Sequence, residues 1–254
     1  MSGRPGRALL WLAIVGLATI ALLGTEIIKD RNPSSADYGP VLSLDGVVGL
    51  APAGAPVPVV VWMGDSTASG VGVLRPEDAL PRQTASLVGA PERVVSLAVS
   101  GARISGVLGR QVPRVPPDAD VIVIDVGAND VTHAARLATF HRQYEAVLRR
   151  LPARVAVILL GVPDVGSARR LDQPLRAIAG WRGRSLSTVI RGLARRHHAA
   201  FVDIARSTGP AFRHDPKRYF FRDGYHPDAA GYRLWAQAVA PALSAALARA
   251  GPPR

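Results

Sequence analysis

Two separate groups of residues could together supply a serine nucleophile and its base. The first is Gly64-Asp65-Ser66, which offers a hydroxyl, and the second runs from Asp223 to His226, with a carboxylate three residues before an imidazole. A histidine can remove the proton of a serine hydroxyl, and a carboxylate can fix the tautomer of that histidine and stabilise its charged form. Ser66, His226 and Asp223 are therefore candidates for a nucleophile, a general base and the group that orients the base.

Two further groups could stabilise the oxyanion that such a nucleophile creates. Ser100-Gly101-Ala102 contains a glycine, whose backbone N–H can approach a ligand closely. Gly127-Ala128-Asn129-Asp130 contains an asparagine, whose neutral side-chain amide can donate to an oxyanion. Gly101 and Asn129, with the backbone N–H of Ser66, are candidates for an oxyanion hole.

Each group also has a purely structural interpretation. Ser66 can cap a helix, Gly101 can occupy a turn and Asn129 can close an Asx turn. His226 can be a surface histidine, because a residue before proline is pushed out of the helical region and onto a loop. We expect Asp65 to be a structural hydrogen-bond partner of the loops. We expect surface or loop positions for the remaining histidines singled out here, which are His133, His197, His198 and His214.

The elements that must position these groups alternate along the chain. Apolar runs predict five strands, at residues 57–63, 93–98, 121–126, 155–160 and 200–204. Between and after them we expect helices at residues 78–89, 104–112, 133–151, 175–197 and from about 228 onward, the last kinked at Pro241. This alternation predicts an α/β fold with a parallel sheet covered on both faces, and such sheets bind ligands at the carboxyl ends of their strands. The first three groups follow the first three predicted strands.

Taken together, the four groups resemble the SGNH hydrolase family, also called GDSL lipases and esterases. The resemblance spans roughly residues 57–247, and residues 223–236, DGYHPDAAGYRLWA, are similar to actinobacterial members. It implies a three-layer α/β/α sandwich around a flavodoxin-like, five-stranded parallel sheet. It also implies a catalytic triad of Ser66, Asp223 and His226, and an oxyanion hole of Ser66, Gly101 and Asn129. Thr67 stands where the named motif has leucine, at a position that varies widely in such enzymes.

The function implied by this resemblance is that of a serine esterase or lipase. Such an enzyme cleaves carboxylic esters through an acyl-serine and needs no metal or organic cofactor. The substrate would be a small-molecule, lipid or glycan ester, and we expect a monomer. One alternative is an acyltransferase that uses the same triad on a cell-envelope glycan or lipid, and no sequence feature separates the two. A carbohydrate- or lipid-binding domain without catalysis is a further alternative, but it would not need Ser66, Asp223 and His226 together.

Composition excludes several other classes of protein. The chain of 254 residues is 48% hydrophobic and has no cysteine, which excludes a disulfide scaffold, a thiolate zinc site and a cysteine nucleophile. The net charge of +12 is carried almost wholly by arginine. Because the arginine pairs are scattered and not interleaved with aromatic residues, we expect no nucleic-acid partner. We attribute the charge to solubility and a weak affinity for anionic lipid.

The amino-terminal part of the sequence predicts export. Residues 8–24 carry no charge and follow Arg4 and Arg7, so residues 1–29 are predicted to be a signal-anchor or transmembrane segment. A cleaved signal peptide, which would give a secreted protein, has a similar profile. Residues 30–56 read as a Pro/Gly-rich stem, whose apolar stretch 41–50 could dock on the hydrolase domain at 57–254. We expect a single-pass protein of the cell membrane with an extracytoplasmic catalytic domain. We also expect a shortened chain that begins near Ala53 to be soluble and active.

Overall fold

The computed structural model describes residues 38–52 and 54–250. The predicted signal-anchor segment, residues 1–29, lies outside these ranges. Within them, no helix is both long enough and apolar enough to cross a membrane.

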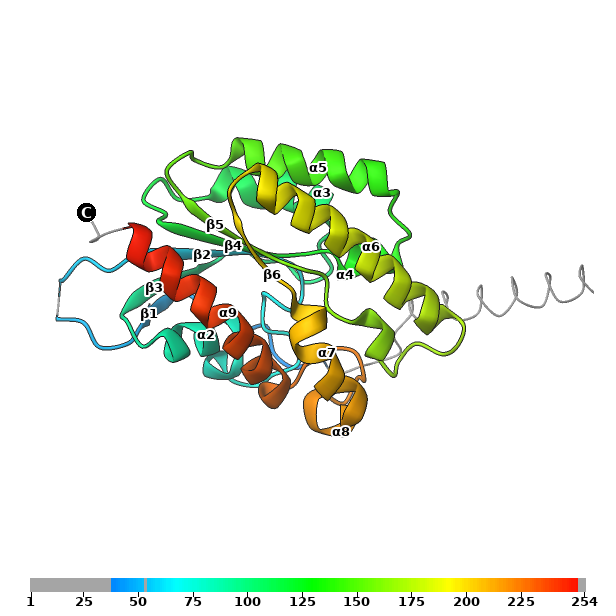
Figure 1. Ribbon diagram of the computed structural model, residues 1–254. Coiled ribbons are helices and arrows are strands. Elements are labelled where there is room, and N and C mark those ends of the chain that lie inside the picture. Colours follow the sequence, from blue (N-terminus) through cyan, green and yellow to red (C-terminus); the bar gives the residue numbers. More distant parts are fainter. Residues whose placement is uncertain (1–37, 53, 251–254) are drawn as a thin grey trace, which may run out of the picture.

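A six-stranded sheet forms the centre of the molecule (Figure 1). Its strands are β1 (Gly46–Val48), β2 (Val59–Gly64), β3 (Glu92–Ser96), β4 (Val121–Asp125), β5 (Ala156–Leu160) and β6 (Ala200–Val202). They lie in the order β1-β3-β2-β4-β5-β6, and β2 to β6 are mutually parallel. The five predicted parallel strands are therefore confirmed.

The sixth strand corrects the predicted strand number. β1 pairs antiparallel with β3, with Gly46 opposite Val94, and so makes the sheet mixed. This strand comes from the segment that we expected to be a stem. The run from 41 to 51 contains no proline, so its backbone N–H groups can pair with an open sheet edge. Leu44 is buried in the core next to β1, and Asp45 Oδ1 accepts the backbone N–H of Ser96 at 2.7 Å.

Helices cover both faces of this sheet and give the predicted three layers (Figure 1). One face carries α3 (Ile104–Gly106), α5 (Leu137–Arg150) and α6 (Leu175–Arg196), and the other carries α2 (Leu80–Val88), α7 (Ile204–His214) and α9 (Ala229–Ala250). Shorter helical turns connect them: η1 (Pro76–Asp78), η2 (Val107–Gln111), η3 (Val112–Arg114), α4 (Ala128–Thr132), η4 (Val165–Ser167) and α8 (Pro216–Tyr219).

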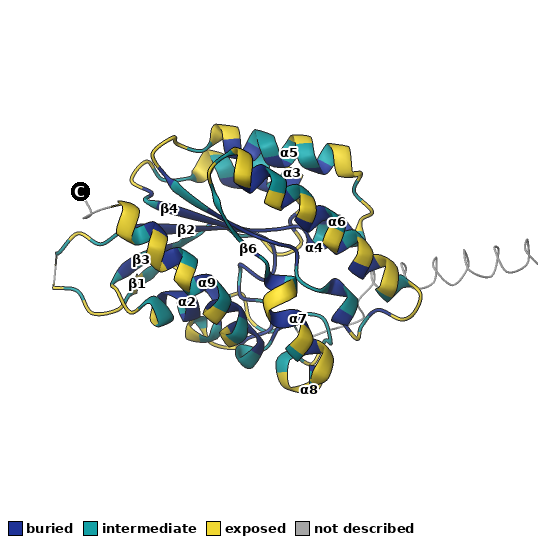
Figure 2. Cartoon of the chain, in the orientation of Figure 1, coloured by how far each residue is buried: buried dark blue, intermediate teal, exposed yellow. Residues whose placement is uncertain are grey.

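Two hydrophobic cores result from the alternation of side chains along the strands. Val61 and Met63 of β2 pack into the core under α5 and α6, whereas Val60 and Trp62 pack into the core under α2 and α9. All residues of β2 and β4 are buried, as Figure 2 shows for the centre of the sheet. The apolar runs were recognisable as strands because both of their faces are covered.

Two helices differ from the sequence-based expectation. The helix expected from residue 133 begins at Leu137, because the chain first turns through Ala134, which has a φ of +51°. Helix α7 was not predicted, since Gly209 and Pro210 lie inside it and normally disfavour a helix. Asp203 stabilises its start by accepting the backbone N–H of Arg206.

Candidate active site

The turn after β2 presents Ser66 at the carboxyl edge of the sheet. Gly64 has a φ of +151°, and a Cβ there would lie 1.9 Å from the carbonyl oxygen of Asp125. Only glycine fits this position, so the chain can turn sharply against β4. The side-chain amide of Gln111 forms two hydrogen bonds with the backbone of Gly64. Its Oε1 accepts the N–H and its Nε2 donates to the carbonyl, each at 2.8 Å. Sequence analysis missed Gln111, because no motif points to it.

Ser66, His226 and Asp223 form a continuous hydrogen-bonded line. Ser66 Oγ lies 2.9 Å from His226 Nε2, and His226 Nδ1 lies 2.5 Å from Asp223 Oδ2. The serine and the histidine are 160 residues apart in sequence and are both buried. The fold thus brings together the three residues that the sequence predicted as nucleophile, base and orienting acid.

Asp223 is held as a carboxylate by its surroundings. Burial alone would raise the pKa of Asp223, but its hydrogen bond to His226 and the charge of that ring outweigh burial and lower the pKa below its ordinary value. The backbone N–H groups of Tyr225 and His226 also donate to Asp223 Oδ1, both at 3.0 Å. An ionised Asp223 assigns the proton of the neutral imidazole to Nδ1, which leaves Nε2 free to accept the Ser66 proton.

The loop that carries His226 is fixed by its own backbone and by the loop after Ser66. The N–H of Phe221 donates to the carbonyl of His226 at 2.8 Å, and Gly224 turns the loop with a φ of +65°. Gly72 lies so close that a Cβ there would meet the carbonyl oxygen of Pro227 at 2.3 Å. The loop after Ser66 and the loop that carries His226 are therefore packed closely against each other.

The predicted oxyanion donors face one open pocket of about 210 Å³ together with Ser66 and His226. In the described part of the chain, the backbone N–H groups of Ser66 and Gly101 have no acceptor. One N–H of the Asn129 amide donates to the carbonyl of Ala102 at 3.2 Å, which orients the side chain and leaves a second N–H for a ligand. The site thus has three donors of the kind that stabilise a tetrahedral oxyanion.

A cluster of buried acids lies beneath Ser66. Thr67 Oγ1 is 3.0 Å from Asp65 Oδ1 and 2.7 Å from Asp125 Oδ2. One hydroxyl proton cannot satisfy two carboxylates, so one of the acids must carry a proton. Burial, followed by the nearby Asp65, raises the pKa of Asp125 to about 7. Burial also raises the pKa of Asp65. As expected, Asp65 hydrogen bonds within its own loop, to the backbone N–H of Thr67.

Asp130 connects the two oxyanion segments. Its Oδ2 accepts the backbone N–H of Ile104 at 3.0 Å, which ties the loop containing Gly101 to the helix turn containing Asn129. Burial raises the pKa of Asp130 to about 6. Sequence analysis did not assign a role to Asp130, although it directly follows Asn129.

Tyr38 is a second residue that sequence analysis missed, because it lies in the expected stem. Its ring stands edge-on to His226 with 5.7 Å between ring centres, and its hydroxyl accepts from Arg170 Nη1 at 2.9 Å. The carbonyl of Tyr38 accepts the backbone N–H of Gly72. Tyr38 also lines the open pocket, so the amino-terminal segment contributes to the site itself.

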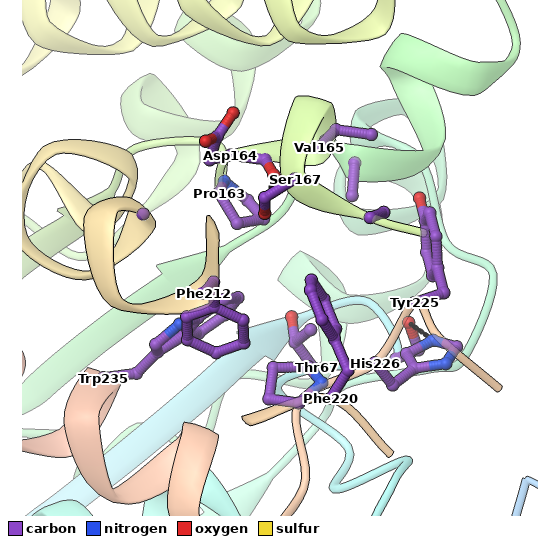
Figure 3. Close-up of a pocket in the computed structure, with 15 residues that line it drawn as sticks. Thr67, Pro163, Asp164, Val165, Ser167, Phe212, Phe220, Tyr225, His226 and Trp235 are labelled. Carbon is purple, nitrogen blue, oxygen red and sulfur yellow. Dashed lines mark hydrogen bonds between the residues drawn. The ribbon is translucent and has the colours of Figure 1, made fainter. Parts of the chain in front are cut away.

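A second, narrow pocket of about 30 Å³ also adjoins Ser66 and His226 (Figure 3). Its walls are mainly apolar and come from the ends of several elements, namely Thr67, Pro163, Val165, Phe212, Phe220, Pro227 and Trp235. The free space between these walls is small compared with that of the open pocket.

The other histidines lie apart from the Ser66–His226 pair. His133 is exposed but lines the rim of the open pocket, where Nδ1 lies 2.8 Å from the carbonyl oxygen of Asn129. His198 and His214 are exposed and His197 is half-buried, all three outside both pockets. Across residues 38–52 and 54–250, no three potential metal ligands gather.

The fold and the site together define a class of protein. An α/β/α sandwich with serine, histidine and aspartate in line at the carboxyl edge of its parallel strands has the side-chain arrangement of serine hydrolases. Residues 62–234 match the model of the GDSL-like lipase/acylhydrolase family. The chain is also 35% identical over 193 residues to a GDSL-like esterase of Mycobacterium tuberculosis, a match that covers 72% of this chain and 61% of the relative. The chain belongs to the GDSL-like lipase/acylhydrolase family.

Solved structures agree with this fold. An acetyl xylan esterase is 22% identical with a TM-score of 0.60, and the match covers 73% of this chain and 99% of that one. A phospholipase A1 of Streptomyces albidoflavus is 22% identical with a TM-score of 0.56, covering 74% and 99% of the two chains. At this identity the likeness establishes the fold, and the match to the M. tuberculosis relative spans less than two thirds of that protein.

Proposed function

We propose that this protein is a serine esterase that hydrolyses carboxylic esters through an acyl-serine. The observation that carries the proposal is the line from Ser66 Oγ through His226 to Asp223, with distances of 2.9 and 2.5 Å. Family membership supports it independently.

In this mechanism His226 Nε2 accepts the Ser66 proton while Oγ attacks the ester carbonyl. The resulting oxyanion receives hydrogen bonds from the N–H groups of Ser66 and Gly101 and from the amide of Asn129. The imidazolium is stabilised by Asp223 and gives its proton to the leaving alcohol. Water, activated by the same histidine, then releases the acid and restores the serine hydroxyl.

The test is hydrolysis of p-nitrophenyl esters by the full chain. Ser66→Ala and His226→Ala should each lower kcat by at least ~10⁴-fold, because the triad acts as a unit. Ser105→Ala, on the exposed side of α3, is the matched control and should keep full activity. Circular dichroism verifies that each variant is folded. Near-normal turnover by folded Ser66→Ala would refute the assignment of the nucleophile.

The narrow pocket favours a short acyl group. Because the pocket adjoins Ser66 and its free space is small, acetyl and propionyl esters should have the highest kcat/KM. A chain-length series from acetyl to palmitoyl tests this. A preference for palmitoyl would show that the acyl chain lies elsewhere.

Two further parts of the proposal concern the acceptor and the location. Release of acid without an added alcohol distinguishes a hydrolase from an acyltransferase, which would use the same residues. We also propose that the protein is exported and held at the cell membrane by residues 1–29, on the ground of the uncharged run 8–24 after Arg4 and Arg7. Amino-terminal sequencing of the exported protein tests the alternative of cleavage and secretion.

A further inference from the structure

Exposed apolar side chains gather at the amino-terminal end of α6. Ile178 and Trp181 are 39% and 58% exposed, and their spacing of three places them on one side of the helix. Leu137, at the start of α5, is 45% exposed. Arg182 Nη2 donates to the carbonyl of Ala135 at 2.6 Å, which ties this part of α6 to the segment just before Leu137. We call Leu137, Ile178 and Trp181 the α6 rim.

The α6 rim lies at the catalytic edge of the molecule. Gly180, next to Trp181, packs so closely on Gly166 that a Cβ there would lie 3.1 Å from the Gly166 Cα. Gly166 belongs to η4, whose Val165 lines the narrow pocket beside Ser66. Exposed positions recur along the outer side of α6 in Figure 2. A surface that covered the rim would therefore face the entrance to the site.

The charge around the rim is strongly positive. Residues 168–184 contain five arginines and one aspartate, Asp172. Arg169 and Arg184 are exposed, so their charges reach the surface. Tryptophan and isoleucine beside arginines are the composition of helices that lie at the interface of an anionic membrane, since the indole suits the headgroup region and arginine pairs with anionic headgroups.

The position of the amino-terminal segment supports the same orientation. The described chain begins at Tyr38, against the ring of His226. The uncharged run 8–24 ends 14 residues before it, which is at most about 50 Å of extended chain. A membrane that held this run would be connected to the described chain at the catalytic edge.

We propose that the α6 rim docks on an anionic lipid bilayer, so that the open pocket faces the membrane. A consequence, which rests on the proposed esterase function, is that the substrate is a membrane-borne ester. Its short acyl group would enter the narrow pocket while its lipid part remains in the open pocket and the bilayer.

Docking can be measured on the full chain because it contains no cysteine. Trp181→Cys is labelled with an environment-sensitive fluorophore, and the protein is reconstituted in vesicles of phosphatidylcholine and phosphatidylglycerol that carry nitroxide lipids. Leu50→Cys is the matched control, since it is 99% exposed beyond the end of β1 that lies opposite the catalytic edge. We expect loss of fluorescence at position 181 and none at position 50. Arg169→Gln with Arg184→Gln should weaken the quenching.

Two results would overturn docking at the α6 rim, and a third would overturn the proposed orientation. One is a label at position 181 that stays in water and is not quenched. The other is a label that is shielded before vesicles are added and not quenched afterwards, which would mean that the chain's own amino-terminal residues or a second copy cover the rim. Equal quenching at positions 50 and 181 would also contradict the orientation.

The consequence for the substrate is tested with two esters. Trp181→Gln should leave hydrolysis of soluble p-nitrophenyl acetate unchanged, but lower hydrolysis of 1,2-dipalmitoyl-3-acetylglycerol in the same vesicles about tenfold, because one large apolar contact with lipid is lost. Equal rates on the vesicle ester for both proteins would refute a role of the α6 rim in reaching a membrane-borne substrate. If neither ester is cleaved by the unaltered protein, the esterase proposal fails, while the quenching experiment still decides the docking.

Discussion

Asn129 is the residue at which the structural and the chemical interpretations give opposite expectations. Its Nδ2 already donates to the Ala102 carbonyl, and its remaining N–H faces the open pocket. Asn129→Ala should lower kcat by about 10²–10³-fold with little change in KM, because the amide acts only on the developing oxyanion. Asn129→Asp should be at least as damaging, since a carboxylate would repel both the oxyanion and the Ala102 carbonyl. Steady-state kinetics with a p-nitrophenyl ester measures both effects.

If Asn129 only closes an Asx turn, the expected activity of Asn129→Asp is different. Aspartate can close the same turn, so Asn129→Asp would then remain active. Thr132→Val, a change in the same short helix that removes a hydroxyl bonded to the carbonyl of Asn129, serves as the control for local disturbance.

At the residue scale, the sequence predicted the residues that the fold brings together, but not the residues that hold them in place. Ser66, Gly101, Asn129, Asp223 and His226 each follow a turn or an apolar run, and their side-chain types allow few other combined roles. The supporting residues Gln111 and Tyr38 could not be predicted in this way, because each acts through a contact with a residue distant in sequence. A glutamine at the end of a helical turn and a tyrosine two residues before a proline have no local pattern that reveals such a contact.

At the scale of elements, β1 is the feature that sequence analysis did not foresee. Three residues without strict alternation give no strand signal, and only the open edge of β3 makes them a strand. The buried strands β2, β4 and β5 were predictable, because burial on both faces requires continuous apolar runs. A chain beginning near Ala53, which we expect to be soluble and active, would lack β1, Leu44 and Tyr38.

The contribution of this segment can be measured in the full chain. Leu44 is buried beside β1, so Leu44→Ala should lower the free energy of unfolding by about 2–5 kcal/mol. Leu50→Ala is the matched control, because that leucine is exposed and its loss should cost under 0.5 kcal/mol. Urea unfolding followed by circular dichroism gives both values. Equal stabilities of the two variants would show that residues 41–50 are not part of the cooperative fold.

At the scale of the whole molecule, Glu92 makes stability depend on pH. Its carboxyl group is fully buried and has no hydrogen-bond partner among the described residues, and burial raises its pKa from 4.5 to about 7. Between these two values the folded chain keeps a proton that the unfolded chain loses, so the free energy of unfolding falls as pH rises. The total change is about 3 kcal/mol, and it is complete about one pH unit above the folded-state pKa.

Glu92→Gln keeps the size and polarity of the side chain but cannot lose a proton. The difference in unfolding free energy between the unaltered protein and this variant should therefore change by about 3 kcal/mol between about pH 4 and about pH 8 and stay constant above that range. Urea unfolding across this pH range measures the difference. A pH-independent difference would mean that Glu92 is ionised in the folded protein. The comparison with a variant isolates Glu92 from Asp125 and Asp130, whose pKa values are also raised.

The sequence separation of 160 residues from Ser66 to His226 would have a consequence for the order of events during the export that we propose. A chain that crosses a membrane from its amino-terminus delivers the serine early and the histidine only near the end of translocation. Until residues 223–226 have emerged, the Ser66 hydroxyl has no base and is a poor nucleophile. If the protein is an exported esterase as proposed, catalytic competence would arise only on the far side of the membrane, and esters of the cytoplasm would not meet an active enzyme.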